Sequence, residues 1–173
     1  MAEHQEIKAG QKATLFEAES TNGKISLEDY GGKYTVLYFY PKDMTPGCTV
    51  QAHEFMALYK EFQKERVEII GVSKDDMPSH HKFCENVNIT YPLIADTEGK
   101  ICHEYGAIRE KVNFGKKYIG IVRSTVIIGK DLRIYKIWKT VRAKGHAEKV
   151  LGFIQASKKL DKTLGKVHWQ KKK

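Results

Sequence analysis

Two apolar runs with a helical stretch between them constrain the fold of this chain more than any other feature. Residues Tyr34–Tyr40, YTVLYFY, lack the polar alternation of a half-exposed strand, which predicts a strand buried on both faces. Residues Val67–Ser73, VEIIGVS, predict a second strand of this kind. From Cys48 to Glu65, apolar side chains recur at helical spacing. A strand, a helix and a strand in this order predict a βαβ unit within a mixed α/β layer.

The rest of the chain continues the alternation of helices and strands. A helix is expected to begin near Pro78 and to run through SHHKFCENVN, and a closing helix is expected from Lys144 to Leu164. Further elements are predicted as a strand at Tyr91–Ala95, a helical turn at Ile101–Tyr105, and a hairpin of Ser124–Ile128 with Arg133–Trp138 around residues 129–131. The stretch before Gly32 carries turn signals and predicts a short hairpin at most.

Size and composition fit one globular domain. The chain has 173 residues, of which 41% are hydrophobic, enough for one sizeable core. No apolar run reaches the roughly 20 residues that a membrane-spanning helix needs. The start, MAEHQEIKAG, has no apolar signal-peptide core. We therefore expect a single domain over residues 1–173, located in the cytoplasm and without a membrane partner.

Most of the net charge of +9 lies at the carboxyl end of the chain. Residues 158–173 contain seven lysines and one aspartate, which is +6, so the remaining residues carry only +3. A basic tail at about residues 165–173 could contact nucleic acid. A solvated terminus explains the same residues without a partner, and we expect that simpler role.

The three cysteines, Cys48, Cys84 and Cys102, form no CxxC motif. Neither a zinc ribbon nor a thioredoxin-type redox pair is therefore encoded. Cys48 stands where the loop PKDMTPG turns into a predicted helix, and a thiolate there is stabilised by the unpaired N–H groups of the first turn. Thr45 places a hydroxyl on the same side of that turn, and Pro46 suits the helix entrance. From the residues alone, a nucleophilic cysteine and an inert half-buried one both fit.

The segment PKDMTPGCT resembles the peroxidatic-cysteine signature of peroxiredoxins, Pro-x-x-x-Thr-x-x-Cys. Its flanks, YFYPKD and CTVQAHEF, are similar to the bacterioferritin-comigratory (PrxQ-type) subfamily, as are GVSKDDMPSHHKFCENVNITYPLIAD, IVRSTVIIGKDLRI and AKGHAEKVL further along. The resemblance covers about residues 12–158. It implies a thioredoxin-like α/β fold of three layers, with a central mixed sheet flanked by helices and an N-terminal β-hairpin extension.

The resemblance also implies a reaction and its residues. Cys48 would attack a peroxide, hydrogen peroxide or an organic hydroperoxide, and become a sulfenic acid. Thr45 would bond the sulfur and the peroxide, and Arg123 would polarise the peroxide and favour the thiolate. The backbone N–H groups of Gly47 and Cys48 would complete the pocket, and Pro41 would screen the cysteine from water. No cofactor and no metal are implied.

The resemblance determines the resolving thiol less firmly than the attacking thiol. One branch of the subfamily has a second cysteine five residues after the first, but that position is His53 here. Another branch has it in the following helix, where this chain has Cys84, so we expect an intramolecular Cys48–Cys84 disulfide that thioredoxin or a similar dithiol reduces. Local unwinding of one or both helix ends would be needed. Resolution by an external thiol is the alternative, and Cys102 is expected to be structural.

Other roles remain open in the sequence. His80, His81 and His103 stand near the two spare cysteines, but their spacing fits no standard zinc finger. His53 and His146 are expected on helix surfaces or as caps, and Gln51 is expected to orient the active-site loop. A one-cysteine peroxidase, a disulfide-exchange protein and a basic nucleic-acid-binding protein are the competing functions. A monomer is expected, although dimers occur in the family.

Overall fold

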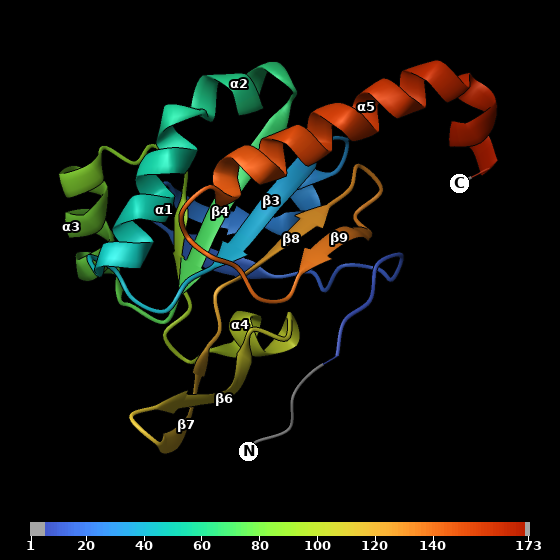
Figure 1. The fold of residues 1–173 in the computed structure, drawn as a ribbon. Helices are drawn as coiled ribbons and strands as arrows, with labels where there is room; N and C mark the ends of the chain where they lie inside the picture. Colours follow the sequence, from blue (N-terminus) through green and yellow to red (C-terminus); the bar gives the residue numbers. More distant parts are fainter. Residues whose placement is uncertain (1–5, 172–173) are drawn as a thin grey trace.

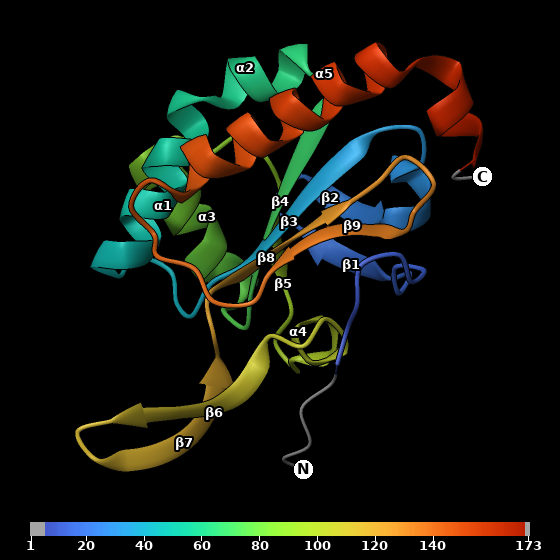
Figure 2. The same cartoon turned by 45° about the vertical axis from the view of Figure 1, so that its right-hand side comes forward.

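The computed structural model describes residues 6–171, with side chains described as far as residue 162. The described residues form strands β1 to β9, helices α1 to α5 and a short 3-10 helix, η1. Figure 1 labels the five helices and strands β3, β4 and β6 to β9, and Figure 2 also labels β1, β2 and β5. The elements are, in chain order, β1 (Glu17–Ser20), β2 (Gly23–Ser26), η1 (Leu27–Tyr30), β3 (Tyr34–Phe39), α1 (Pro46–Ala57), α2 (Tyr59–Lys64), β4 (Val67–Ser73), α3 (Met77–Val87), β5 (Leu93–Ala95), α4 (Lys100–Glu104), β6 (Ile108–Asn113), β7 (Lys116–Ile121), β8 (Ser124–Ile128), β9 (Ile134–Trp138) and α5 (His146–Lys171).

A seven-stranded mixed sheet forms the centre, in the order β2-β1-β5-β4-β3-β8-β9 (Figure 2). Strands β3, β4 and β5 are parallel, whereas β8 and β9 are antiparallel to their neighbours, and so are β1 and β2. The βαβ unit read from the two apolar runs is thereby confirmed. Strands β6 and β7 form a separate hairpin.

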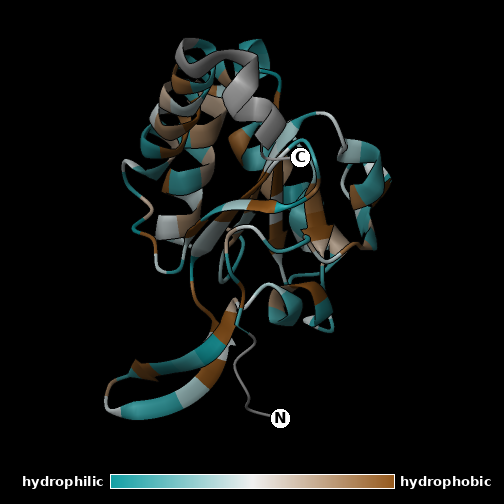
Figure 3. Ribbon diagram, turned by 90° about the vertical axis from the view of Figure 1, so that its right-hand side faces the viewer, coloured by the Kyte–Doolittle hydropathy of each residue, from teal (hydrophilic) through white to brown (hydrophobic). Residues whose placement is uncertain are grey.

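Both faces of the sheet are covered, so the strands read as unbroken apolar runs. In β3, Val36 and Tyr38 point to one side, into a core shared with α1, α3 and α5. Leu37 and Phe39 point to the other side, into a core with α4 and the N-terminal segment. Hydrophobic residues accordingly concentrate on the central strands in Figure 3. The expected three-layer, thioredoxin-like α/β fold with an N-terminal β-hairpin, β1–β2, is confirmed.

Several expectations need adjustment. The helix expected over residues 48–65 starts two residues earlier and is interrupted at Leu58, where the backbone has φ −102° and ψ 6°. The closing helix begins at His146 and continues to Lys171, beyond the expected end at Leu164. Hairpin β6–β7 was not anticipated.

The basic tail is only partly described. Its backbone is helical as far as Lys171, but its side chains lie outside the described part of the chain, so its role stays a prediction. A single domain over the whole chain is likewise still a prediction. Among residues 6–171, no helix is both long and apolar enough to cross a membrane.

Candidate active site

Cys48 is the third residue of α1, directly after the loop that leaves β3. Pro46 is the first residue of the helix, as expected, and helical hydrogen bonding begins with the Thr49 N–H donating to the Thr45 carbonyl at 2.9 Å. The N–H groups of Gly47 and Cys48 therefore have no carbonyl of their own helix to bind. Only 2% of Cys48 is exposed, so its sulfur is shielded from solvent at the positive end of the helix.

Arg123 reaches this sulfur from the segment between β7 and β8. Its Nη2 lies 3.4 Å from the Cys48 Sγ, and its Nη1 donates to Gln51 Oε1 at 2.6 Å. The Val141 N–H donates to the Arg123 carbonyl at 3.0 Å, which fixes the backbone. A Cβ at Gly47 would lie 3.0 Å from the arginine Nη2, so a larger residue here would push the guanidinium away by a few tenths of an ångström.

The remaining predicted site residues lie in the same loop and helix turn. Thr45 is the N-cap residue of α1, and its hydroxyl donates to the Lys42 carbonyl at 2.8 Å instead of capping the helix. Pro41 lies half-buried in the bend after β3. Gln51 is fully buried and orients Arg123, not the loop as expected. Arg123 thus contacts both Cys48 and Gln51.

The loop is held by a buried network that the sequence did not reveal. The side chain of Asp43, 1% exposed, accepts hydrogen bonds from the Tyr40 hydroxyl at 2.6 Å and the Ser79 hydroxyl at 2.8 Å. Its Oδ2 also lies 2.7 Å from Nδ1 of His80, which is fully buried. The other His80 nitrogen, Nε2, faces the Ile94 carbonyl at 2.9 Å. Both ring nitrogens thus face acceptors, which suits a protonated imidazolium.

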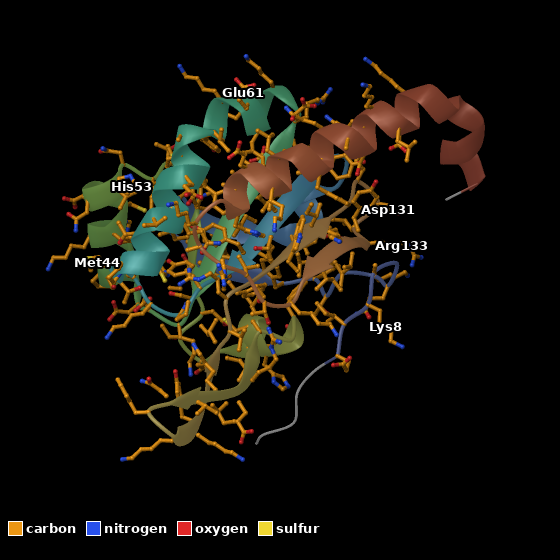
Figure 4. All side chains as sticks on the ribbon, in the orientation of Figure 1. Lys8, Met44, His53, Glu61, Asp131 and Arg133 are labelled. Atoms are coloured by element: carbon orange, nitrogen blue, oxygen red, sulfur yellow. The ribbon has the colours of Figure 1, made fainter. Side chains whose placement is uncertain are left out.

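The contacts of Asp43 affect both the pKa of His80 and the backbone of the loop. The pKa of His80 is raised, because the hydrogen bond and the charge of Asp43 outweigh the opposing effect of burial. The Asp43 N–H also donates to Asp75 Oδ2 at 2.8 Å, so the loop is tied by both backbone and side chain. Met44, next in the chain and labelled in Figure 4, has φ +63°, a conformation that costs free energy and persists only where neighbours enforce it.

The other two cysteines differ in exposure. Cys84 lies half-buried on α3 against the same core cluster that contains Cys48, and both are free thiols. Burial raises the pKa of Cys84, although a hydrogen bond with the Thr21 side chain opposes this. Cys102 is fully buried on α4, and burial together with nearby Asp96 holds its pKa well above the ordinary thiol value. Such a thiol is unreactive, in keeping with a structural role.

The histidines fall into different environments. His53 is exposed on α1, as expected and as Figure 4 shows. His146, the first residue of α5, is only 4% exposed, and its Nε2 lies 2.9 Å from the Thr125 hydroxyl, so the expectation of a helix-surface position was wrong. Burial lowers the pKa of His146 to about 4.

One group in the described chain could hold a metal ion by proximity, namely Asp43, Asp75 and His80, whose ligand atoms lie within 4.8 Å of one another. The contacts above show that these atoms already have hydrogen-bond partners within the protein. Such a network does not require an ion. The zinc alternative with His81, His103 and the spare cysteines gathers no such group among residues 6–162.

A buried cysteine at the start of a helix, contacted by an arginine and carried by a thioredoxin-like sheet, is the arrangement of a thiol-based redox enzyme. Comparison with known proteins narrows the class. The AhpC/TSA family model matches residues 9–137. Peroxiredoxin Bcp of Bacillus subtilis is 44% identical over 146 residues, which cover 84% of this chain and 93% of that protein. Peroxiredoxin Bcp of Escherichia coli K12 is 33% identical over 150 residues, 86% of this chain and 96% of that protein.

Solved structures agree with this assignment. The Xanthomonas campestris bacterioferritin comigratory protein superposes with a TM-score of 0.79 at 34% identity, covering 84% of this chain and 97% of that one. A mutant of Xylella fastidiosa PrxQ gives a TM-score of 0.84 at 34% identity, covering 88% and 98%. The chain therefore belongs to the AhpC/TSA family, as a peroxiredoxin of the bacterioferritin-comigratory (PrxQ) type. Membership implies a peroxidase with a peroxide substrate and a thiol reductant.

Proposed function

We propose that this protein reduces hydrogen peroxide and organic hydroperoxides with Cys48 as the attacking thiolate. The observation that carries the proposal is the contact of Arg123 Nη2 with the Cys48 sulfur, 3.4 Å away, at the start of a helix. A guanidinium and a helix N-terminus both favour negative charge on sulfur. They also lie where charge develops on the oxygen that leaves.

The chemical step needs no other reactant. The thiolate forms a bond to one peroxide oxygen, the O–O bond breaks, and the second oxygen leaves with a proton as water or an alcohol. Arg123 and the N–H groups of Gly47 and Cys48 stabilise the departing oxygen, and the Thr45 hydroxyl aligns the peroxide. Pro41 shields the sulfur from water. Cys48 is left as a sulfenic acid.

Cys84 then resolves the sulfenic acid. Its sulfur bonds to the Cys48 sulfur, and the hydroxyl leaves as water. Support comes from the position of both cysteines against one core cluster, on two different helices. Solved structures of the Xanthomonas campestris PrxQ include its C48S and C84S mutants, whose substituted cysteines are as far apart in number as Cys48 and Cys84 here. Closure requires local unwinding, because a disulfide needs α-carbons within about 7 Å.

A dithiol such as thioredoxin completes the cycle by reducing the disulfide. The alternative, a one-cysteine cycle with an external thiol, has its own support. A yeast mitochondrial 1-Cys peroxiredoxin, resolved through glutathione/thioredoxin systems, superposes with a TM-score of 0.79 at 29% identity. We favour the two-cysteine cycle because α3 carries Cys84. We further propose that the protein is a cytoplasmic monomer. Nucleic acid binding by the basic tail is the remaining alternative.

Intact mass and peptide mapping after one equivalent of peroxide test the mechanism. The unaltered protein should lose about 2 Da, located to Cys48 and Cys84, and Cys102→Ser should do the same as the matched control. Cys84→Ser should instead gain about 16 Da at Cys48. A Cys84→Ser variant with unchanged thioredoxin-coupled turnover would contradict the resolving role, and peroxide consumption by Cys48→Ser would contradict the whole mechanism.

A further inference from the structure

Hairpin β6–β7, residues Ile108–Ile121, which we call the arm, is the feature that the peroxidase chemistry leaves unexplained. Its strands pair in register from Ile108 with Ile121 to Asn113 with Lys116, and they form a two-stranded sheet of their own. The arm projects away from the body of the molecule in Figures 1 and 2. A two-stranded hairpin without packing on either face is marginal in water, so the choice of its side chains is informative.

One face of the arm carries apolar side chains beyond the point where the core ends. Residues that pair across a hairpin share a face, and the face alternates along each strand. Ile121 is buried in the core and Ile108 packs against that core. On the same face, further out, Ile119 is 49% exposed and Val112 is 66% exposed. Hydrophobic bands continue along the arm in Figure 3.

Phe114 adds a further exposed apolar side chain at the tip of the arm. It occupies the first position of a two-residue turn with φ +52°, followed by Gly115 with φ +77°, the pattern of a type I′ turn. Asparagine is the residue usually found at that first position, since bulky side chains are strained at positive φ. Phe114 is nevertheless 96% exposed, so it contributes no packing to the fold. A strained, exposed aromatic side chain points to a role in binding.

The opposite face is cationic. Arg109, Lys111 and Lys116 lie on it with Tyr118, and the Lys111 ammonium lies 5.9 Å from the centre of the Tyr118 ring. Lys117 pairs with Val112 and Glu110 pairs with Ile119, so these two charges lie on the first face; the arm as a whole carries four basic residues and one acid. Two copies of such an arm repel each other. Charge complementarity therefore favours an acidic partner with an apolar patch.

We propose that the arm is the docking site for the acidic dithiol protein of the thioredoxin class that reduces this enzyme, an inference that rests on the proposed function. The arm leads through Val122 directly into Arg123. The next residue, Ser124, pairs with Phe39 at the end of β3, where the Cys48 loop begins. A protein held by the arm would thus lie at the end of the sheet where its thiol must attack the Cys48–Cys84 disulfide. Because that disulfide forms in every cycle of the proposed function, the protein that reduces it is the macromolecule required each time.

The double variant Phe114→Asn/Val112→Thr tests this role without disturbing the fold. Asparagine fits the left-handed turn position better than phenylalanine does, and threonine is a good strand former. The matched control is Leu15→Thr, another exposed apolar residue, 52% exposed, outside the arm. Peroxide turnover is measured with an acidic bacterial thioredoxin and, separately, with dithiothreitol, which is too small to need docking. We expect the KM for thioredoxin to rise about tenfold, with dithiothreitol-driven turnover unchanged.

The outcomes separate the proposals. An unchanged thioredoxin KM would overturn the docking role, as would an equal loss with both reductants. If sedimentation velocity showed a dimer that Phe114→Asn converts to a monomer while the thioredoxin KM stays the same, the arm would be an interface between copies and the proposal wrong. Absence of dithiothreitol-driven turnover in the unaltered protein would instead refute the proposed peroxidase function. Charge reversal, Lys116→Glu/Lys117→Glu, should lower the association rate with thioredoxin and its salt dependence.

Discussion

Replacing Asp43 by asparagine tests how the active-site loop is held. The substitution keeps the size of the side chain but removes its negative charge. The Asp43 carboxylate accepts from Tyr40, Ser79 and His80, and each of these bonds is 2.6–2.8 Å long. The amide retains one acceptor oxygen and turns an N–H₂ donor toward groups that are themselves donors. The buried imidazole then loses the charge that favours its proton.

The magnitude follows from burial. The side chains of Asp43 and His80 are 1% and 0% exposed, so solvent cannot replace the lost interaction. Breaking a buried pair by removing one partner costs about 3–5 kcal/mol. That is a large share of the roughly 5–15 kcal/mol that stabilises a typical domain. At about 2–4 °C for each kcal/mol in a chain of this size, Tm should fall by about 10 °C.

The pH dependence gives the sharper test. The pKa of His80 is raised in the folded protein, mainly by its hydrogen bond to Asp43, so its stabilising effect is complete below the unfolded value of about 6.5. The effect is lost as the pH rises through the folded pKa. The free energy of unfolding from urea titrations should therefore fall between pH 6 and pH 9 in the unaltered protein and fall less in Asp43→Asn. His81→Gln, an exposed histidine on the same helix, is the control and should behave like the unaltered protein.

Two results would refute this reasoning. A loss below about 1 kcal/mol in Asp43→Asn at pH 6 would mean that the network contributes no more than an ordinary hydrogen bond. An identical fall with pH in the variant and in the unaltered protein would mean that Asp43 does not raise the pKa of His80.

Three further predictions concern single groups. Gly47→Ala should lower the rate of the peroxide step about tenfold with little change in stability, since its Cβ would lie 3.0 Å from the Arg123 Nη2; stopped-flow peroxide consumption measures this. His146 has a pKa of about 4, below its unfolded value, so its neutral form is preferred in the folded protein and its own contribution to stability should be about 2 kcal/mol smaller at pH 5 than at pH 7; urea titrations of His146→Gln should lack this contribution. The pKa of Cys84 is raised by burial, so disulfide closure after a pulse of peroxide should still accelerate above the pH at which an ordinary thiol is half ionised, as mass spectrometry of quenched samples would show.

The sequence predicted the parts of the site that depend on local chemistry. Cys48 lies at a helix start because Pro46, two residues before it, favours the first helical position. Arg123 is different, since 75 positions separate it from Cys48 and only the sheet brings them together. No rule of spacing selects that arginine among the others, and the resemblance to peroxiredoxins supplied it.

The parts of the site and of the fold that depend on long-range packing could not be predicted from the sequence. Asp43 reads as a loop residue and His80 as a helix residue with polar neighbours, so neither signals burial. Their pairing follows from where α3 packs against the loop. The arm was missed for the opposite reason: its outer part packs on nothing, and the side chains of IREKVNFGKKYIGI show neither a clean alternation nor a helical period.

Helix α3 has two duties in the proposed cycle, and these oppose each other. His80 holds the Cys48 loop through Asp43, whereas Cys84, one helical turn further along, must leave its half-buried position to close the disulfide. A tighter network preserves the geometry for attack on the peroxide but makes local unwinding more costly. Asp43→Asn should therefore slow the peroxide step and speed disulfide closure. If both steps slowed together, the network would serve only to keep the domain folded, and the coupling of the loop to the resolving helix would be wrong.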